Sequence, residues 1–337
     1  MEQSVLDLHP GLVVGFGITV MIMLLLDLGV FNKNSHVVSS KEATVWSIVW
    51  ISLSMIFSGV VYYVFNQDAG GHAVAVEKFA QYQAAYWIEK ALSIDNLFVF
   101  ILVFSYFKVP RELHHKVLFW GIIGALVFRA IFIFAGVGII NLTYLPEMML
   151  LGQPVKVNLV LTIFGFFLIY GGIKSWGGHQ GTNENQDLSQ SMGVRLIKKF
   201  YKVSPNYDGD KFFTIQNGVK VATPLLLVVA VIEFTDVIFA VDSIPAIFAI
   251  SKDPFILYTS NIFAILGLRS LYFLLANFIH IFSKLPYGLA IILTFIGVKM
   301  VISPWFHIPS PISLGIVGSV LALSMILSVM FPHRKES

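Results

Sequence analysis

Long apolar segments recur along the whole chain, and short polar stretches separate them. A helix needs about 20 apolar residues to cross a bilayer, and it satisfies its own backbone hydrogen bonds in lipid. These segments are too long for barrel strands, so we predict an all-α, polytopic helical membrane protein with about nine transmembrane helices. Residues 1–337 would form a single membrane domain. The nine predicted spans cover about residues 10–31, 43–65, 79–106, 115–139, 155–173, 222–250, 254–278, 285–302 and 311–331.

Composition agrees with this class and excludes some chemistry. The chain is 57% hydrophobic and 12% charged, against roughly 25% charged residues in soluble domains. It has no cysteine, which excludes disulfides, thiolate metal sites and thiol redox chemistry. The net charge of +3 comes without a basic stripe, so we expect no nucleic-acid partner. The start, MEQSVLDLHP, lacks the basic region of a cleavable signal peptide, and we expect the first helix to remain.

The positions of lysine and arginine predict the orientation. Fifteen of them fall on one side of the nine spans, and only Lys78, Lys156 and Lys252 fall on the other. Because basic loops stay inside, the N-terminus would be periplasmic or external and the C-terminus cytoplasmic. The polar segment 175–221 is then a cytoplasmic loop. Within it, MGVRLIKKFY is typical of an amphipathic surface helix, and NYDGDKFFTIQNGVKV of a small β-hairpin or turn.

Three features occur twice in the same order. EKALSIDN at 89–96 aligns with DVIFAVDS at 236–243, the arginine segment GALVFRAIF with AILGLRSLY, and LIYGGIK with LTFIGVK. Each copy has three spans, so the second would enter the membrane from the opposite side. We therefore predict an inverted repeat, with copies at 79–174 and 222–302, as in many secondary transporters. Chance similarity between apolar segments is the alternative.

Five acids lie near the middle of two predicted spans: Glu89, Asp95, Glu233, Asp236 and Asp242. Each charge at the membrane centre costs about 2.5–3.5 kcal/mol on insertion scales, so such residues usually have a function. Two interpretations remain open. The acids form a cation pathway, or they form structural ion pairs with the candidate charge partners Lys90, Arg129 and Arg269.

Helix geometry limits how these acids can act together. Glu89 and Asp95 are six residues apart and face different directions on a straight helix, whereas Glu233 and Asp236 share a face. A compact site needs the two helices to cross or to break. Pro245 favours a break beside Asp242, because it frees the carbonyl of Val241.

The donor groups available are hard oxygens. Asn96 and Ser243 follow the two matched aspartates, and Ser93 and Asn261 add further donors. Such ligands suit Mg²⁺, Ca²⁺ or Mn²⁺ rather than Zn²⁺ or Cu²⁺. The histidines fall in loops, at span ends or in terminal segments, and we expect the His114–His115 pair to be solvated. We expect no permanently bound cofactor.

The segments that carry these acids resemble the TerC/Alx family of integral membrane proteins. The resemblance rests on YWIEKALSIDNLFVFILVFSYFKVP, ATPLLLVVAVIEFTDVIFAVDSIPAIFAI and DPFILYTSNIFAILGLRSLYFLL, and covers about residues 15–302. It implies a bacterial inner-membrane protein, Mn²⁺ as the transported ion, and the five intramembrane acids as its ligands. The label of redox modulator also belongs to Alx-like proteins.

These observations together lead us to expect a divalent-cation exporter, Mn²⁺ first, with export coupled to proton entry. Its partners would be the cation, protons and the lipid bilayer. It would not be an enzyme. The metal-ligand set would be Glu89, Asp95, Asn96, Glu233, Asp236, Asp242 and Ser243. Two alternatives remain: a membrane redox modulator, and an accessory subunit that delivers metal to other proteins.

Overall fold

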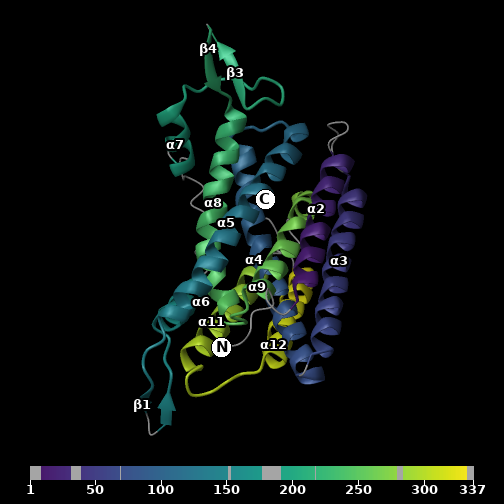
Figure 1. The fold of residues 1–337 in the computed structure, drawn as a ribbon. Coiled ribbons are helices and arrows are strands. Elements are labelled where there is room, and N and C mark those ends of the chain that lie inside the picture. The colour runs from purple at the N-terminus through teal and green to yellow at the C-terminus, as the bar shows by residue number, and fades with distance from the viewer. Residues whose placement is uncertain are drawn as a thin grey trace.

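The computed structural model describes residues 9–31, 39–68, 70–150, 153–176, 191–216, 218–278 and 284–331, and it is a bundle of long helices (Figure 1). All nine predicted spans coincide with helical segments in these ranges. The long helices are α2 (Pro10–Phe31), α3 (Ser40–Asn66), α4 (Gly71–Tyr106), α5 (Arg111–Leu142), α6 (Leu159–Trp176), α8 (Pro224–Phe248), α9 (Pro254–Leu266), α10 (Leu268–Phe278), α11 (Leu285–Ile302) and α12 (Ser310–Met330).

Seven helical segments of the described chain are long and apolar enough to cross a membrane. They are α3, α5, α6, α8, the pair α9–α10, α11 and α12. The part of α2 whose side chains the structure describes, Pro10–Leu25, is an apolar helix of shorter length. The 36-residue α4 contains Glu77, Lys78, Glu89 and Lys90, and it does not reach the same apolar character. The protein is therefore a polytopic helical membrane protein, and the count of nine spans stays a prediction.

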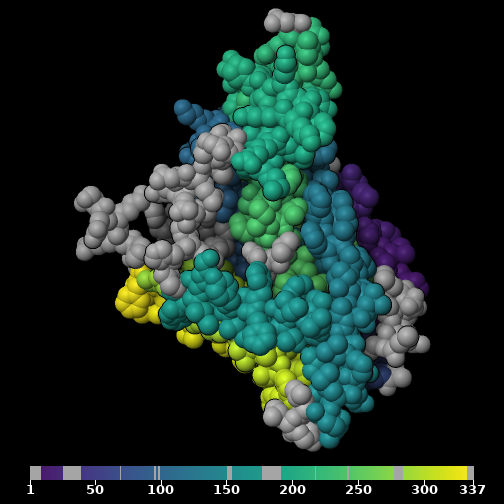
Figure 2. Space-filling view, turned by 90° about the vertical axis from the view of Figure 1, so that its left-hand side faces the viewer, coloured from purple at the N-terminus to yellow at the C-terminus, as the bar shows by residue number. Residues whose placement is uncertain are grey.

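Two short hairpins and one short helix mark the two ends of the bundle. The hairpin of β1 (Met148–Leu150) and β2 (Gln153–Val155) extends from one end. Helix α7 (Met192–Phe200) and the hairpin of β3 (Phe213–Gln216) and β4 (Val219–Ala222) form the other end (Figures 1 and 2). The last two elements confirm the predicted amphipathic helix and hairpin. The β1–β2 hairpin was not predicted, and residues 177–190 of the predicted cytoplasmic loop lie outside the described residues.

The segment that follows α7 is attached to the helix bundle by specific contacts. The hydroxyl of Tyr207 donates a hydrogen bond to the carbonyl of Phe107 at 2.8 Å. Burial raises the pKa of Tyr207 to about 12, so the phenol keeps its proton near neutral pH. Lys116 at the start of α5 forms an ion pair with Asp210 at 2.8 Å. The loop between α6 and α8 is thus held against the α4–α5 connection.

The expected break in the sixth span is wrong, because α8 runs without interruption through Pro245. Pro245 removes the backbone hydrogen bond to the carbonyl of Val241 without ending the helix, which continues to Phe248. The discontinuity lies instead in the seventh predicted span, where Gly267 separates α9 from α10. A Cβ atom at Gly267 would lie 2.8 Å from Nζ of Lys90 and 3.0 Å from Cβ of Trp50, so a larger residue would not fit.

Helices α6 and α11 pack with their backbones in contact. A Cβ atom at Gly297 would lie 2.6 Å from the carbonyl oxygen of Gly165 and 2.8 Å from the nitrogen of Ile169. A Cβ atom at Gly172 would lie 2.7 Å from the carbonyl oxygen of Ala290 and 2.9 Å from the nitrogen of Thr294. The alignment that places Lys174 on Lys299 also places Gly172 on Gly297. It places Gly165 on Ala290 and Ile169 on Thr294, so each set of contacts corresponds to the other. The contacts of Gly172 and Gly297 are therefore equivalent under this alignment, and the inverted repeat stays a prediction.

Candidate carboxylate site

Four helices bring charged and amide side chains together inside the bundle. Glu89 comes from α4, Arg129 from α5, Asp236 from α8 and Asn261 from α9, and each is at most 5% exposed. Nη1 of Arg129 donates to Oε1 of Glu89 and, at 3.2 Å, to Oδ1 of Asn261. Nη2 of Arg129 donates to Oδ1 of Asp236 at 3.3 Å. One arginine thus joins an acid from each copy of the predicted repeat.

Every oxygen of Glu89 has a partner. Oε1 accepts from Arg129 and from the hydroxyl of Ser93 at 3.2 Å, and Oε2 accepts from Nδ2 of Asn261 at 3.0 Å. A buried carboxylate is tolerated when it is paired and its remaining lone pairs are hydrogen-bonded. Glu89 meets both conditions, so it behaves as a structural part of the network.

The acids of α8 are less completely paired. Oδ2 of Asp236 and Oε2 of Glu233 are buried, and within the described chain neither has a hydrogen-bond partner. Glu233 faces α5, where its carboxylate occupies the space that a side chain at Gly124 would need. Oγ of Ser243 is likewise buried without a partner. Positions 233, 236 and 243 lie on one side of a helix, so α8 presents a row of oxygen atoms to its neighbours.

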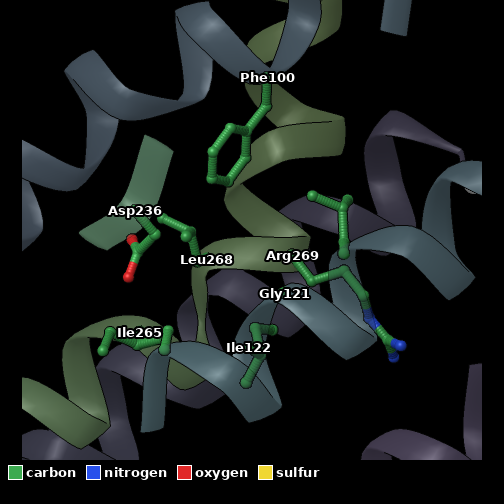
Figure 3. Close-up of a pocket in the computed structure, with 9 residues that line it drawn as sticks. Phe100, Gly121, Ile122, Asp236, Ile265, Leu268 and Arg269 are labelled. Carbon is green, nitrogen blue, oxygen red and sulfur yellow. The ribbon is translucent and has the colours of Figure 1, made fainter. Parts of the chain in front are cut away.

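A small void lies next to this row (Figure 3). Asp236 and Arg269 both line it, with apolar residues that include Phe100, Ile122 and Leu268. The guanidinium of Arg269 points away from Asp236 (Figure 3). The void measures about 10 Å³, about the minimum that a single water molecule needs. The described part of the site is therefore closed in this conformation.

The remaining predicted ligands follow the same two helices. Asp95 and Asp242 lie on the continuous helices α4 and α8, and their side chains are outside the described part of the structure. Asn96 and Ser243, which follow them, are buried at 6% and 4% exposure. Among the described side chains, no group of three or more His, Asp or Glu could hold a metal ion. The full predicted ligand set is thus not assembled from the described residues alone.

The candidate charge partners behave differently from one another. Arg129 pairs with two acids, as the structural interpretation expected. Lys90 is buried and donates to the carbonyl of Ala264 at 3.2 Å, and no described carboxylate lies within ion-pair distance of it. Arg269 is buried, at 3% exposure, on α10 beside the void. Arg129 therefore lies among the acids of the site.

Sequence reasoning missed two features of this region. His114 is not solvated as expected: it stacks on Phe104 with ring centroids 4.2 Å apart, and its Nδ1 lies 3.0 Å from the hydroxyl of Tyr272. Its place in the first turn of α5, beside the end of α4, produces this packing. Gly124 was recognised only as part of the arginine segment, although its missing side chain makes room for Glu233.

Comparison with known proteins identifies the family. Residues 74–336 match the integral membrane protein TerC family, and this range includes every residue of the site. The chain belongs to the TerC family. No solved structure matches the chain.

Similar TerC-family relatives align over almost the whole chain. An "uncharacterized membrane protein" of Myxococcus xanthus is 42% identical, with 95% of this chain and 92% of the relative covered. The "Putative membrane-bound redox modulator Alx" of Escherichia coli (strain K12) is 41% identical, with 96% and 95% covered. An "uncharacterized membrane protein" of Rickettsia bellii is 40% identical, with 91% and 93% covered.

Proposed function

We propose that this TerC-family protein exports divalent metal cations from the cytoplasm, Mn²⁺ in the first place. The observation that carries the proposal is the row of buried oxygen atoms on α8. Glu233, Asp236 and Ser243 each have a buried oxygen with no hydrogen-bond partner within the described chain. Buried polar atoms are normally satisfied, and exceptions are frequent where a ligand binds. Asp95 and Asp242 would complete the ligand set.

Arg129 gives the unloaded site an internal counter-charge. Its contact with Asp236, at 3.3 Å, is longer than its contact with Glu89, which also has two other hydrogen-bond donors. An arriving divalent cation would compete with Arg129 for Asp236, while Arg129 stays on Glu89 and Asn261. Glu89 is then an anchor for Arg129, and Glu233 and Asp236 are the described ligands.

The donor chemistry supports a hard cation but does not choose among Mn²⁺, Ca²⁺ and Mg²⁺. Support for Mn²⁺ comes from the family resemblance. Coupling to protons follows from ligand chemistry, because a carboxylate must lose its proton to bind a metal ion. Protons that enter from outside would therefore release the cation and reset the site. The protein would act as a transporter rather than as an enzyme, in the cytoplasmic membrane.

Flux measurements on the purified protein test this proposal. Proteoliposomes with an imposed pH gradient would be given Mn²⁺, Ca²⁺, Mg²⁺ and Zn²⁺ in turn. We expect Mn²⁺ flux that depends on the gradient, and little Zn²⁺ flux. Glu233→Gln should abolish the flux, because Gln lacks the charge that the ion needs. Absence of flux for every ion with correctly folded protein would overturn the proposal.

The name of the relative from Escherichia coli favours a second candidate, a membrane-bound redox modulator. Such a protein needs an electron-carrying group, and this chain offers no cysteine. An absorption spectrum of the purified protein separates the candidates: a flavin or haem band would support the redox role. Mn²⁺ transport by the protein alone would argue against a further alternative, an accessory subunit that needs a partner.

A further inference from the structure

A polar cavity of about 460 Å³ opens at the β1–β2 end of the bundle, away from the carboxylate site. This volume falls in the range of small-molecule pockets, roughly 300–1,000 Å³. Lys78, Lys156 and Lys252 line it, and they are the three basic residues that the sequence assigns to the outer side. Lys299 joins them from α11. The sparse positive charge of this end therefore converges on one cavity.

The acids of the cavity do not balance this charge. Asp253 forms an ion pair with Lys78 at 3.1 Å and also caps the start of α9. Glu77 accepts hydrogen bonds from Ser310 at 2.6 Å and from Gln81 at 3.2 Å. Among the described residues, no carboxylate lies within ion-pair distance of Lys156, Lys252 or Lys299. The lining thus has four lysines, Lys78, Lys156, Lys252 and Lys299, against two carboxylates, Glu77 and Asp253, and it keeps a net positive charge.

Lys299 is the most unusual of the three. It is only 7% exposed, and within the described chain its Nζ donates to a single group, Oγ of Ser313, at 2.9 Å. An ammonium group has three donors and is costly to bury without a counter-charge. Nζ of Lys252 donates one hydrogen bond to the hydroxyl of Tyr144 and lies 4.8 Å from the centroid of its ring. Both ammonium groups keep donors for a ligand.

We propose that this cavity binds a phosphate group, either as a free phosphate or as the headgroup of an anionic lipid. Several lysines around one cavity suit an anion with several oxygens, because each lysine acts as a point charge. Basic pockets between membrane helices bind lipid phosphates in the same way. Phe248, Met300 and Phe306 also line the cavity, which would suit an attached apolar group. This site is independent of the proposed cation export.

Binding experiments on the full-length protein test the assignment. In detergent, inorganic phosphate would be titrated by calorimetry. In nanodiscs of phosphatidylcholine with and without phosphatidylglycerol, retained lipid would be measured by native mass spectrometry. We expect Lys299→Gln and Lys252→Gln each to weaken binding about tenfold or more, since each removes a charge-assisted hydrogen bond.

Lys174→Gln is the matched control. Lys174 ends the helix that aligns with α11, but it is exposed and lies over the ring of Tyr170 at the other end of the bundle. Binding should be unchanged in this variant. If the Lys→Gln variants lose phosphate binding in detergent, free phosphate is the ligand. If they lose only the retained phosphatidylglycerol in nanodiscs, the lipid headgroup is the ligand. If Lys299→Gln does not fold, the exposed Lys252→Gln decides. No binding in either arm, or equal binding by Lys252→Gln and the native protein, would overturn the proposal.

Discussion

Glu89 and Glu233 have the same side chain but different surroundings, and this difference predicts opposite effects of the same substitution. Glu89 holds the buried Arg129, so Glu89→Gln leaves a guanidinium short of one charge. Breaking a buried pair costs on the order of 3–5 kcal/mol. Oε2 of Glu233 has no described partner, so Glu233→Gln removes an unfavourable buried charge. Thermal unfolding in detergent should show a clear loss of stability for Glu89→Gln and little change in stability for Glu233→Gln.

For cation export we expect a large effect of Glu233→Gln, although this substitution changes stability little. Normalised to the amount in the membrane, Glu233→Gln should lose cation export. A Glu233→Gln protein that is as unstable as Glu89→Gln would contradict the division between an anchor and a ligand.

The matched aspartates Asp95 and Asp242 carry a separate prediction. Replacing either with Asn preserves size and removes a charge, which lowers the cost of placing the residue in the membrane. As ligands, both variants should reach normal membrane levels and lose Mn²⁺ export. If the aspartates only pair with arginines, the variants should instead be depleted, because a buried arginine loses its partner. Immunoblots of membranes together with Mn²⁺ accumulation in cells measure the two outcomes.

Single residues also show what the sequence could not predict. Intramembrane acids are costly, and this rule selected Glu89, Glu233 and Asp236 correctly as buried or partly buried residues of the bundle. The cost of intramembrane acids could not distinguish the anchor Glu89 from the ligands Glu233 and Asp236. That distinction depends on which donors from the other helices reach each carboxylate oxygen. The prediction that His114 is solvated failed for the same reason, because its stacking partner Phe104 belongs to another helix.

At the scale of elements, the contact of α6 with α11 gives a direct test of the repeat. A side chain at Gly297 or at Gly172 would meet backbone atoms of the partner helix, which cannot rotate away. Gly297→Val and Gly172→Val should therefore each destabilise the protein by about 1–3 kcal/mol or more, and by similar amounts if the two-fold relation holds. Thermal unfolding in detergent provides the measurement.

Gly171 is the neighbouring control. Nothing lies within 4 Å of a Cβ atom at this position. Gly171→Ala should be neutral or stabilising by about 0.5–1 kcal/mol, since alanine favours a helix over glycine. If Gly297→Val destabilises the protein and Gly172→Val does not, the two contacts are not equivalent.

Elements were predictable where hydrophobic length determines them, and less so where tertiary contacts do. Apolar runs located most long helices within about four residues, because lipid requires helices of that length. Helix α4 is the exception, since it begins at Gly71, eight residues before its predicted span. The break was assigned to Pro245, but α8 continues through this residue. The interruption lies at Gly267, and the close approach of Lys90 and Trp50 there is a tertiary feature. The β1–β2 hairpin has no alternating pattern long enough to reveal it.

For the whole molecule, the orientation in the membrane is the property on which the direction of transport depends. The basic residues that the sequence assigns to the inside include those of α7 and the β3–β4 hairpin, at one end of the bundle. The three outer lysines line the cavity at the other end. A reporter fused after Ser337 and a tag inserted near Asn185 should both report cytoplasm. A tag between β1 and β2 should be reached from outside. If the first two tags are periplasmic, the protein has the opposite orientation in the membrane. The predicted direction of transport, from the cytoplasm outward, would then be wrong, and each repeat copy would enter the membrane from the side predicted for the other.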